Sequence, residues 1–177
     1  PGPHGPLDAQ WPPGAALRLD PRAEGPTLLL FLHGKCPCSQ ASLSELAEVL
    51  ARSRVPLRVH VYVYRPATKA EHWTETALWK QARALPGINL HWDDDGDEAR
   101  RFGALTSGEV LLWAVTGRLL FRGGITSSRG HVGDNEGRSA LLALIERESA
   151  AARSASVYGC PILGSDPARG SAVTEKP

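Results

Sequence analysis

Continuous apolar runs alternate with amphipathic stretches along most of the chain. Residues 27–33 are almost entirely apolar, which is typical of a strand covered on both faces. From Ser39 onward the apolar residues recur every three or four positions, as on one face of a helix. Residues 55–64 are rich in β-branched and aromatic side chains, so they predict a second strand in the core.

Similar patterns, bounded by glycine and proline, predict the remaining elements. We expect strands at 15–19, 88–92, 110–115 and 118–121, and helices at 71–85, 98–102 and 138–153. Thr116 and Gly117 are typical of a tight hairpin turn between the last two strands. Strands that alternate with helices, followed by a hairpin, predict an α/β fold: a three-layer sandwich with a central mixed β-sheet flanked by helices.

Composition describes an ordinary folded domain rather than a specialised chain. The 177 residues are 42% hydrophobic and 22% charged, with a net charge of +1. Acidic and basic residues are interspersed, so no basic stripe predicts a nucleic-acid partner. No apolar run reaches the roughly 18 residues that a membrane-spanning helix needs.

The two ends of the chain differ from its middle. Residues 1–14 are rich in proline and glycine, and the chain contains no methionine. We expect an extended lead-in there, left after removal of an export signal or membrane anchor, although a truncated chain would begin in the same way. A domain would follow at 15–153, and a polar tail at 154–177. The expected location is periplasmic or otherwise extracytoplasmic, with contact to a membrane only through such an anchor.

Two of the three cysteines, Cys36 and Cys38, stand in the stretch FLHGKCPCS, between the first long strand and its helix. In α/β sheets, ligands and chemistry collect where a strand passes into a helix. The positive end of the helix dipole makes a thiol placed there a thiolate more easily, and the thiolate is the reactive species. The sequence therefore predicts a thiolate site at this junction.

The residues around the cysteine pair strengthen that prediction. His33 and Lys35 add positive charge close to the thiols. Pro37 would keep the helix from starting earlier, and Ser39 is a good N-cap residue.

This combination of strand, short turn, cysteine pair and helix resembles the thioredoxin-like superfamily. More narrowly, CPCS, TSGEVLLW, GGITSSRGHVGDNEG and a late YGCP resemble RedB-like extracytoplasmic bacterial proteins, over roughly residues 27–162. The resemblance implies thiol–disulfide exchange without a cofactor, with Cys36 attacking and Cys38 as its partner. It also implies a protein or small-molecule thiol or disulfide substrate and a thiol electron donor.

The chain departs from the superfamily pattern in two respects. Its cysteines are spaced C-x-C rather than C-x-x-C. The cis-proline expected before the hairpin is absent from LTSGEV, where Thr106, Ser107 and Gly108 stand instead. We expect Thr106 and Ser107 to support the thiol site from this position.

The third cysteine, Cys160, lies in VYGCPI, an apolar island within the polar tail. Such an island predicts that the tail folds back onto the domain. The seven residues from Arg153 to Cys160 span at most ~25 Å when extended, which is enough to return the chain to the thiol site. Cys160 would then resolve Cys36 or Cys38; the alternative is a buried or incidental thiol.

The long loop at 123–137 is rich in glycine and serine. Loops of this length commonly carry function. Arg129 and His131 could border the thiol site, stabilising a thiolate or moving a proton. The alternative is a surface connection in which Asp134 and Asn135 form a turn.

Two other functions use the same residues. Cys36, Cys38 and Cys160, with His131 or His33, could hold copper or zinc, as in the SCO-type copper proteins, although the C-x-x-x-C-P spacing of that family is missing. A peroxiredoxin-like peroxidase would need Thr or Ser three residues before the attacking cysteine, and this chain has none there.

Overall fold

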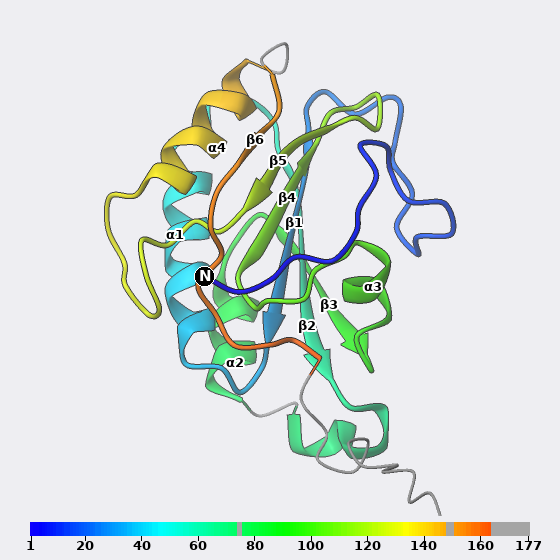
Figure 1. Ribbon diagram of the computed structural model, residues 1–177, viewed down its shortest axis with the longest axis vertical. Coiled ribbons are helices and arrows are strands. Elements are labelled where there is room, and N and C mark those ends of the chain that lie inside the picture. Colours follow the sequence, from blue (N-terminus) through cyan, green and yellow to red (C-terminus); the bar gives the residue numbers. More distant parts are fainter. Residues whose placement is uncertain (74–75, 148–150, 164–177) are drawn as a thin grey trace, which may run out of the picture.

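The computed structural model describes residues 1–73, 76–147 and 151–163. At its centre is a six-stranded mixed sheet with the order β3-β2-β1-β4-β5-β6 (Figure 1). The strands are β1 (Thr27–His33), β2 (Arg58–Arg65), β3 (Ile88–Asp94), β4 (Glu109–Trp113), β5 (Leu119–Gly123) and β6 (Arg153–Ser154). The helices are α1 (Cys38–Arg52), η1 (Ala67–Trp73, a 3-10 helix), α2 (Ala77–Ala84), α3 (Asp97–Arg101) and α4 (Glu136–Glu146).

The strand directions are those of the predicted thioredoxin-like α/β sandwich, which is confirmed. Strands β1, β2 and β3 are parallel, as their crossover helices require. Strand β4 runs antiparallel to both β1 and β5, and forms the predicted hairpin with β5.

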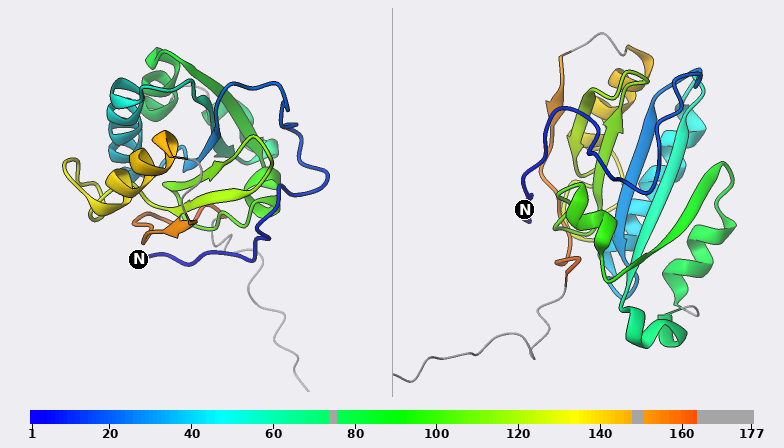
Figure 2. Two further views of the ribbon diagram at one scale, coloured as in Figure 1. Left: turned by 90° about the horizontal axis from the view of Figure 1, so that it is seen from above. Right: turned by 90° about the vertical axis from the view of Figure 1, so that its right-hand side faces the viewer.

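Strand β1 is apolar throughout because both of its faces are covered. Leu28, Leu30 and Leu32 belong to the core under α1, α2 and α4. Leu29 and Phe31 point to the opposite face, which is covered by α3 and the N-terminal segment, residues 1–26 (Figure 2). The C-terminal end of β1, where the turn to α1 starts, is therefore anchored in the core through residues 27–32.

Helix α1 follows β1 after a turn of only four residues. Its inward face carries Leu43, Leu46 and Val49, all 2% exposed or less. This burial stabilises the helix and fixes its first turn directly beyond the C-terminal end of β1. Its basic last turn ends at Arg52, and the chain becomes extended at Ser53.

The prediction of a strand at residues 15–19 is wrong. The main-chain N–H of Ala16 donates to the carboxylate of Glu98 at 3.2 Å, instead of to another strand. Leu17 packs against the face of the sheet, so this stretch lies over the sheet and not within it.

Two predicted helices are shorter than expected. The helix predicted at 71–85 is replaced by η1 and α2, and residues 74–75 lie outside the described residues. The helix predicted at 138–153 ends at Glu146, and Arg153–Ser154 pair with β5 instead. The local residues favour a helix, but pairing with a strand from elsewhere in the chain overrides that preference. Residues 148–150 lie outside the described residues.

Both ends of the described chain pack onto the domain. Trp11 meets Phe102 and Trp113 edge to face, with ring centroids 5.0 and 5.3 Å away. The Gly2 N–H donates to the Val157 carbonyl at 2.7 Å, which ties the start of the chain to its tail. The division at residues 14 and 153 stays a prediction. Among the described residues, no helix is long and apolar enough to cross a membrane.

Candidate active site

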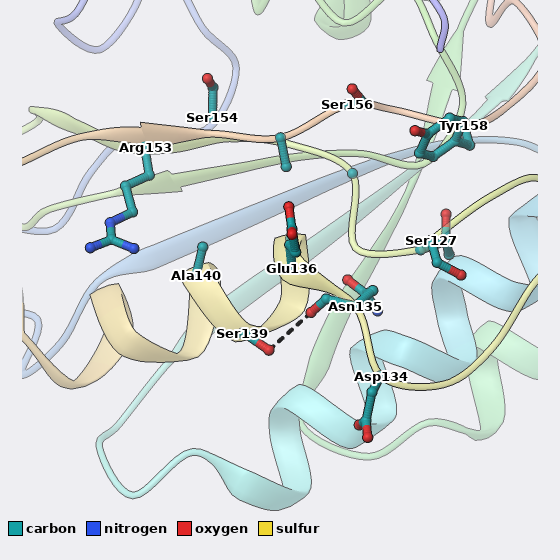
Figure 3. A pocket seen from close by; sticks show the side chains of 14 residues that line it. Ser127, Asp134, Asn135, Glu136, Ser139, Ala140, Arg153, Ser154, Ser156 and Tyr158 are labelled. Atoms are coloured by element: carbon teal, nitrogen blue, oxygen red, sulfur yellow. Dashed lines mark hydrogen bonds between the residues drawn. The ribbon is translucent and has the colours of Figure 1, made fainter.

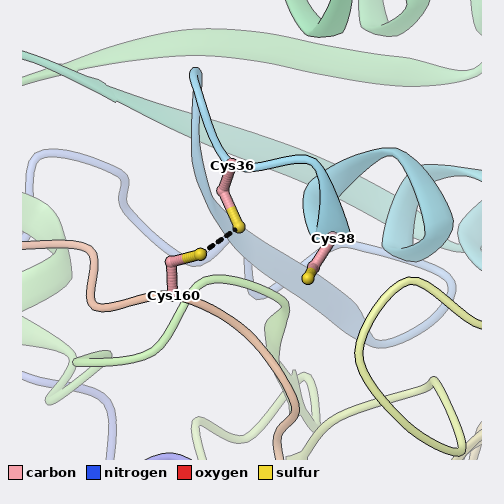
Figure 4. Close-up of side chains that lie close together, drawn as sticks. All are labelled: Cys36, Cys38 and Cys160. Atoms are coloured by element: carbon pink, nitrogen blue, oxygen red, sulfur yellow. Dashed lines mark hydrogen bonds between the residues drawn. The ribbon is translucent and has the colours of Figure 1, made fainter.

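The three cysteines meet where β1 passes into α1 (Figure 4). Cys36 lies in the turn, Cys38 is the first residue of α1, and Cys160 arrives from the tail. The Sγ atoms of Cys36 and Cys160 point toward one another and are hydrogen bonded at 2.9 Å. All three Sγ atoms lie within 4.8 Å of one another. Cys36 is only 4% exposed, whereas the other two are half-buried.

Main-chain hydrogen bonds bring Cys160 to this place. The Ser107 N–H donates to the Cys160 carbonyl at 2.8 Å, and the Ile162 N–H donates to the Leu105 carbonyl at 2.9 Å. Val157 and Ile162 anchor the tail through side chains that are 0% and 1% exposed. The tail therefore folds back onto the body, as the apolar island predicts, and its cysteine lies beside Cys36.

The surroundings of Cys36 favour its thiolate. Burial alone would raise the pKa of Cys36, but hydrogen bonds to its sulfur lower the pKa by more. These bonds come from the thiol and N–H of Cys160, the N–H of Cys38 and the hydroxyl of Ser39. With Cys36 as the thiolate, the Cys160 thiol is the donor between the two sulfur atoms.

The other two thiols keep their protons. Burial, the nearby Cys36 thiolate and a hydrogen bond to it raise the pKa of Cys38. The hydrogen bond to Cys36, followed by burial and the charges of the other thiols, raises the pKa of Cys160 to about 11. Of the three cysteines, only Cys36 has a lowered pKa, so the thiolate predicted at this junction is favoured at Cys36 and not at Cys38.

Ser39 has a different role from the predicted N-cap. Pro37 occupies the N-cap position, and no side chain caps the helix there. The Ser39 hydroxyl lies 3.1 Å from the His33 carbonyl oxygen and 2.7 Å from the Ser107 hydroxyl. The Ser107 hydroxyl in turn accepts the His33 N–H at 2.9 Å. This buried pair of hydroxyls joins the end of β1 to the loop before β4, directly beneath Cys36.

Replacing Ser39 by alanine should weaken the Cys36 thiolate. The Ser39 hydroxyl is one of the groups that lower the pKa of Cys36, so its loss should raise that pKa and move the pH profile of alkylation toward higher pH. We expect the alkylation rate at pH 7 to fall by up to about tenfold. Ser44→Ala, on the outer side of the same helix, should leave the profile unchanged; an equal shift in both variants would contradict the assignment.

His33 and Lys35 are held by aromatic rings rather than by the thiols. The His33 ring stacks on Tyr64, with centroids 5.4 Å apart, and meets Trp73 edge to face at 5.2 Å. Burial, and then the charge of Lys35, lower the pKa of His33, so the prediction that His33 adds positive charge is wrong. The Lys35 ammonium lies 4.6 Å from the centre of the Trp73 ring. These contacts fix the turn that carries Cys36.

Of the two loop residues predicted to border the site, Arg129 acts on the thiols and His131 does not. The guanidinium of Arg129 acts electrostatically to lower the pKa of both Cys38 and Cys160, partly offsetting the causes that raise it. His131 is exposed, and its ring nitrogen contacts the Arg129 carbonyl at 3.0 Å. Glu45 of α1 holds the loop in place by accepting the Gly133 N–H at 2.6 Å.

Among the described residues, the three cysteines form the only group of three side chains close enough to share a metal ion. Neither His33 nor His131 belongs to this group, so the histidine ligands considered from the sequence are not supported. Three thiolates without a harder ligand suit a soft ion such as Cu(I) better than a hard one.

Solved structures resemble this fold, whereas no protein family and no curated protein matches the sequence. A hypothetical protein of Sinorhizobium meliloti 1021 aligns with a TM-score of 0.63 and 16% identity, over 92% of this chain and 98% of that chain. An uncharacterized conserved protein of Geobacillus kaustophilus aligns at 0.59 and 17%, over 93% and 92%. An exposed lipoprotein thioredoxin of Streptococcus pneumoniae aligns at 0.49 and 16%, over 70% and 84%. The likeness shows the fold alone.

Sequence reasoning missed residues that shape the site without carrying its chemistry. Gly159 passes so close to the loop before β4 that a Cβ there would lie 1.9 Å from the Ser107 carbonyl oxygen. A glycine directly before the cysteine in VYGCPI was the available signal. Thr106 was expected to support the thiols, but its hydroxyl donates to the Pro3 carbonyl at 2.9 Å and so holds the N-terminal segment.

Proposed function

We propose that this protein is a thiol–disulfide oxidoreductase in which Cys36 is the nucleophile and Cys160 the resolving thiol. The observation that carries this proposal is the geometry at Cys36. Its sulfur receives several hydrogen bonds that favour the thiolate, and the protonated sulfur of Cys160 lies 2.9 Å away. A nucleophile and a proton-bearing partner at contact distance are what two-step exchange requires.

The exchange balances with these two residues alone. The Cys36 thiolate attacks one sulfur of a substrate disulfide, forms a mixed disulfide, and expels the other sulfur as a thiolate. That thiolate takes the Cys160 proton, directly or through water. The Cys160 thiolate then attacks the Cys36 sulfur, which forms the Cys36–Cys160 disulfide and releases the second substrate sulfur as a thiolate. A dithiol donor restores the reduced protein by the reverse steps, and the reduction potentials decide the net direction.

The helix favours Cys160 over Cys38 as the resolving residue. The sequence resemblance named Cys38 for this step and Cys160 as a further relay. The backbone is already helical at Pro37, with φ −60° and ψ −31°. Cys36 itself lies in the turn before α1, and its sulfur is within 4.8 Å of that of Cys38. A Cys36–Cys38 disulfide would close a tight ring across the helical Pro37, whereas the sulfur of Cys160 already lies 2.9 Å from that of Cys36.

An extracytoplasmic location belongs to the same proposal, as does the narrower RedB-like resemblance. A disulfide formed in each cycle persists best in an oxidising compartment, where a dithiol donor must reduce it again. A protein or small-molecule disulfide fits the chemistry of the exchange equally well.

A thiol count tests the proposal. Protein purified aerobically should show two fewer free thiols per chain than after mild reduction, with no bound metal in either sample. Peptide mapping of the oxidised form should recover Cys36 joined to Cys160. Three free thiols in both samples would refute the proposal, and a Cys36–Cys38 bridge would return the resolving step to Cys38.

A second candidate function is binding of a soft metal ion, copper or zinc, for delivery or storage. It is supported by the three sulfur atoms within 4.8 Å of one another. Reduced protein should then take up about one Cu(I) per chain in competition with a chelator, and Cys160→Ser should weaken binding more than tenfold. Purified protein with about one copper or zinc per chain and three thiols would favour this function over exchange.

A further inference from the structure

The proposed nucleophile is covered by the protein's own tail. Cys36 is 4% exposed, and one side of its sulfur is occupied by the sulfur of Cys160. Exchange nevertheless requires the Cys36 sulfur to touch a sulfur of the substrate. We call residues 155–162 the tail strap; it must move for a polypeptide disulfide to reach Cys36.

The tail strap is held at the site as an extended peptide would be held. Its Pro161 forms an antiparallel bridge with Thr106, in the loop before β4. On either side of that bridge, the Ser107 N–H bonds to the Cys160 carbonyl and the Ile162 N–H bonds to the Leu105 carbonyl. Main-chain bonds of this kind do not depend on side chains, so another extended polypeptide could make the same bonds.

This arrangement also presents a cysteine to the nucleophile. The strand pairing holds Cys160 in the register that brings its sulfur to 2.9 Å from Cys36. A substrate polypeptide paired with residues 105–107 in the same way would place its own cysteine at the same point. The tail strap thus occupies the position that a disulfide-bearing chain would take.

Resting on the function proposed above, we propose that the tail strap is a built-in substitute for a polypeptide substrate. An extended, cysteine-containing segment displaces it from residues 105–107 and reacts with Cys36. The strap then returns, and Cys160 resolves the mixed disulfide by the steps given above. The substrate class is therefore polypeptide, and the Cys36–Cys160 disulfide is the closed state of the site.

Open space on both sides of the tail leaves room for this movement. A cavity of about 860 Å³ is lined by Ser156 and Tyr158 of the tail together with Ser127 of the glycine-rich loop and Glu136 of α4 (Figure 3). A second cavity, of about 490 Å³, lies between the tail and the N-terminal segment. The strap is held mainly by its main-chain bonds and by two buried side chains, those of Val157 and Ile162. Few buried apolar contacts are typical of segments that open locally.

Gly159 offers a way to loosen the strap without touching a cysteine. A Cβ at this position would lie 1.9 Å from the Ser107 carbonyl oxygen, so Gly159→Ala should push the strap away from residues 105–107. Ser154→Ala is a matched control because it changes an exposed residue of the same tail and adds no atom.

Amide hydrogen exchange of the unmodified protein tests the strap directly. The amides of Ser107 and Ile162 should exchange at least about tenfold faster in the reduced protein than in the Cys36–Cys160 disulfide form. The Gly108 amide, which bonds to the Phe31 carbonyl within the body at 2.8 Å, serves as the reference and should change little. Equal protection of the Ser107 and Ile162 amides in the two forms would overturn the proposal.

Reaction rates with two disulfides test the substrate class. Reduced protein would be mixed with insulin, a polypeptide disulfide, and with bis(2-hydroxyethyl) disulfide, a small one. Gly159→Ala should raise the ratio of the insulin rate to the small-disulfide rate roughly tenfold, since a loosened strap hinders a large substrate less. Ser154→Ala should leave the ratio unchanged.

The two proposals fail in different ways. An unchanged ratio in folded Gly159→Ala, with exchange intact, would overturn the substitute role and leave the oxidoreductase standing. Reaction with neither disulfide would overturn the oxidoreductase, and the amide exchange would still decide whether the strap opens on reduction.

Discussion

The Cys36→Ser variant should exchange disulfides at least about a thousandfold more slowly than the unmodified protein. The rate would be measured as reduction of insulin by the protein with a dithiol donor. Serine keeps the size of the side chain but does not form an anion at neutral pH, so the nucleophile is lost. The magnitude is typical for removal of a nucleophile whose partners cannot replace it.

Cys38→Ser is the matched control for this variant. The pKa of Cys38 is raised, and its side chain lies on the first turn of α1, so it should contribute little to the first step. We expect its rate to stay within about fivefold of the unmodified protein. A loss at Cys38 equal to that at Cys36 would contradict the assignment of the nucleophile. Loss at Cys38 alone would reverse the roles of the two residues.

The Arg138→Met variant should lower the free energy of unfolding by about 3–5 kcal/mol. Arg138 of α4 donates to the carboxylate of Glu45 on α1, and their side chains are 4% and 0% exposed. Removal of the cation leaves a buried carboxylate with only the Gly133 N–H and the Asn135 amide as partners. Denaturant unfolding followed by circular dichroism would measure the loss.

An exposed ion pair on α1, the helix of Glu45, supplies the comparison. Arg52 and Glu48 approach to 3.4 Å, but their side chains are 53% and 49% exposed. Arg52→Met should therefore change the free energy of unfolding by less than about 1 kcal/mol. Adding Glu45→Leu to Arg138→Met should recover part of the loss, because it removes the unpaired charge. Similar effects at Arg52 and Arg138 would mean that Glu45 is not desolvated in solution.

The buried pair also matters for the thiol site. Glu45 lies on α1, two turns beyond Cys38, and its carboxylate fastens the loop that carries Arg129. Arg129 is the cation that acts on Cys38 and Cys160. An ion pair between two helices thus holds the loop of Arg129 beside the cysteines, which links the stability of the fold to the electrostatics of the site.

Opposite pKa shifts distinguish Cys36 from Cys160, although their side chains are chemically identical. Hydrogen bonds favour the anion at Cys36, and that anion in turn raises the pKa of Cys160 to about 11. Once Cys36 enters a mixed disulfide, its charge disappears, and with it one of the causes that hold the proton on Cys160. In the proposed cycle, Cys160 therefore becomes a better nucleophile at the step that needs it.

The sequence by itself determined the parts of this protein that depend on neighbouring residues. The apolar run at Thr27–His33 and the helical spacing that leads to Leu46 reflect burial patterns that local periodicity records directly. The position of the C-x-C pair, at the junction of the strand and the helix, follows from the same two elements. These features predicted the fold class, the place of the thiols and the return of the tail.

Only the tertiary structure decided which thiols meet and in what state. Cys36 and Cys160 are 124 residues apart, and their contact depends on a strand pairing that no local pattern encodes. Serine is a residue type typical of an N-cap, but the Ser39 hydroxyl is hydrogen bonded to Ser107, in the loop before β4. Strand β6 replaces the end of a helix because β5 offers it a free edge. Such choices depend on contacts between distant segments, whose free energies exceed the small local preferences that a sequence displays.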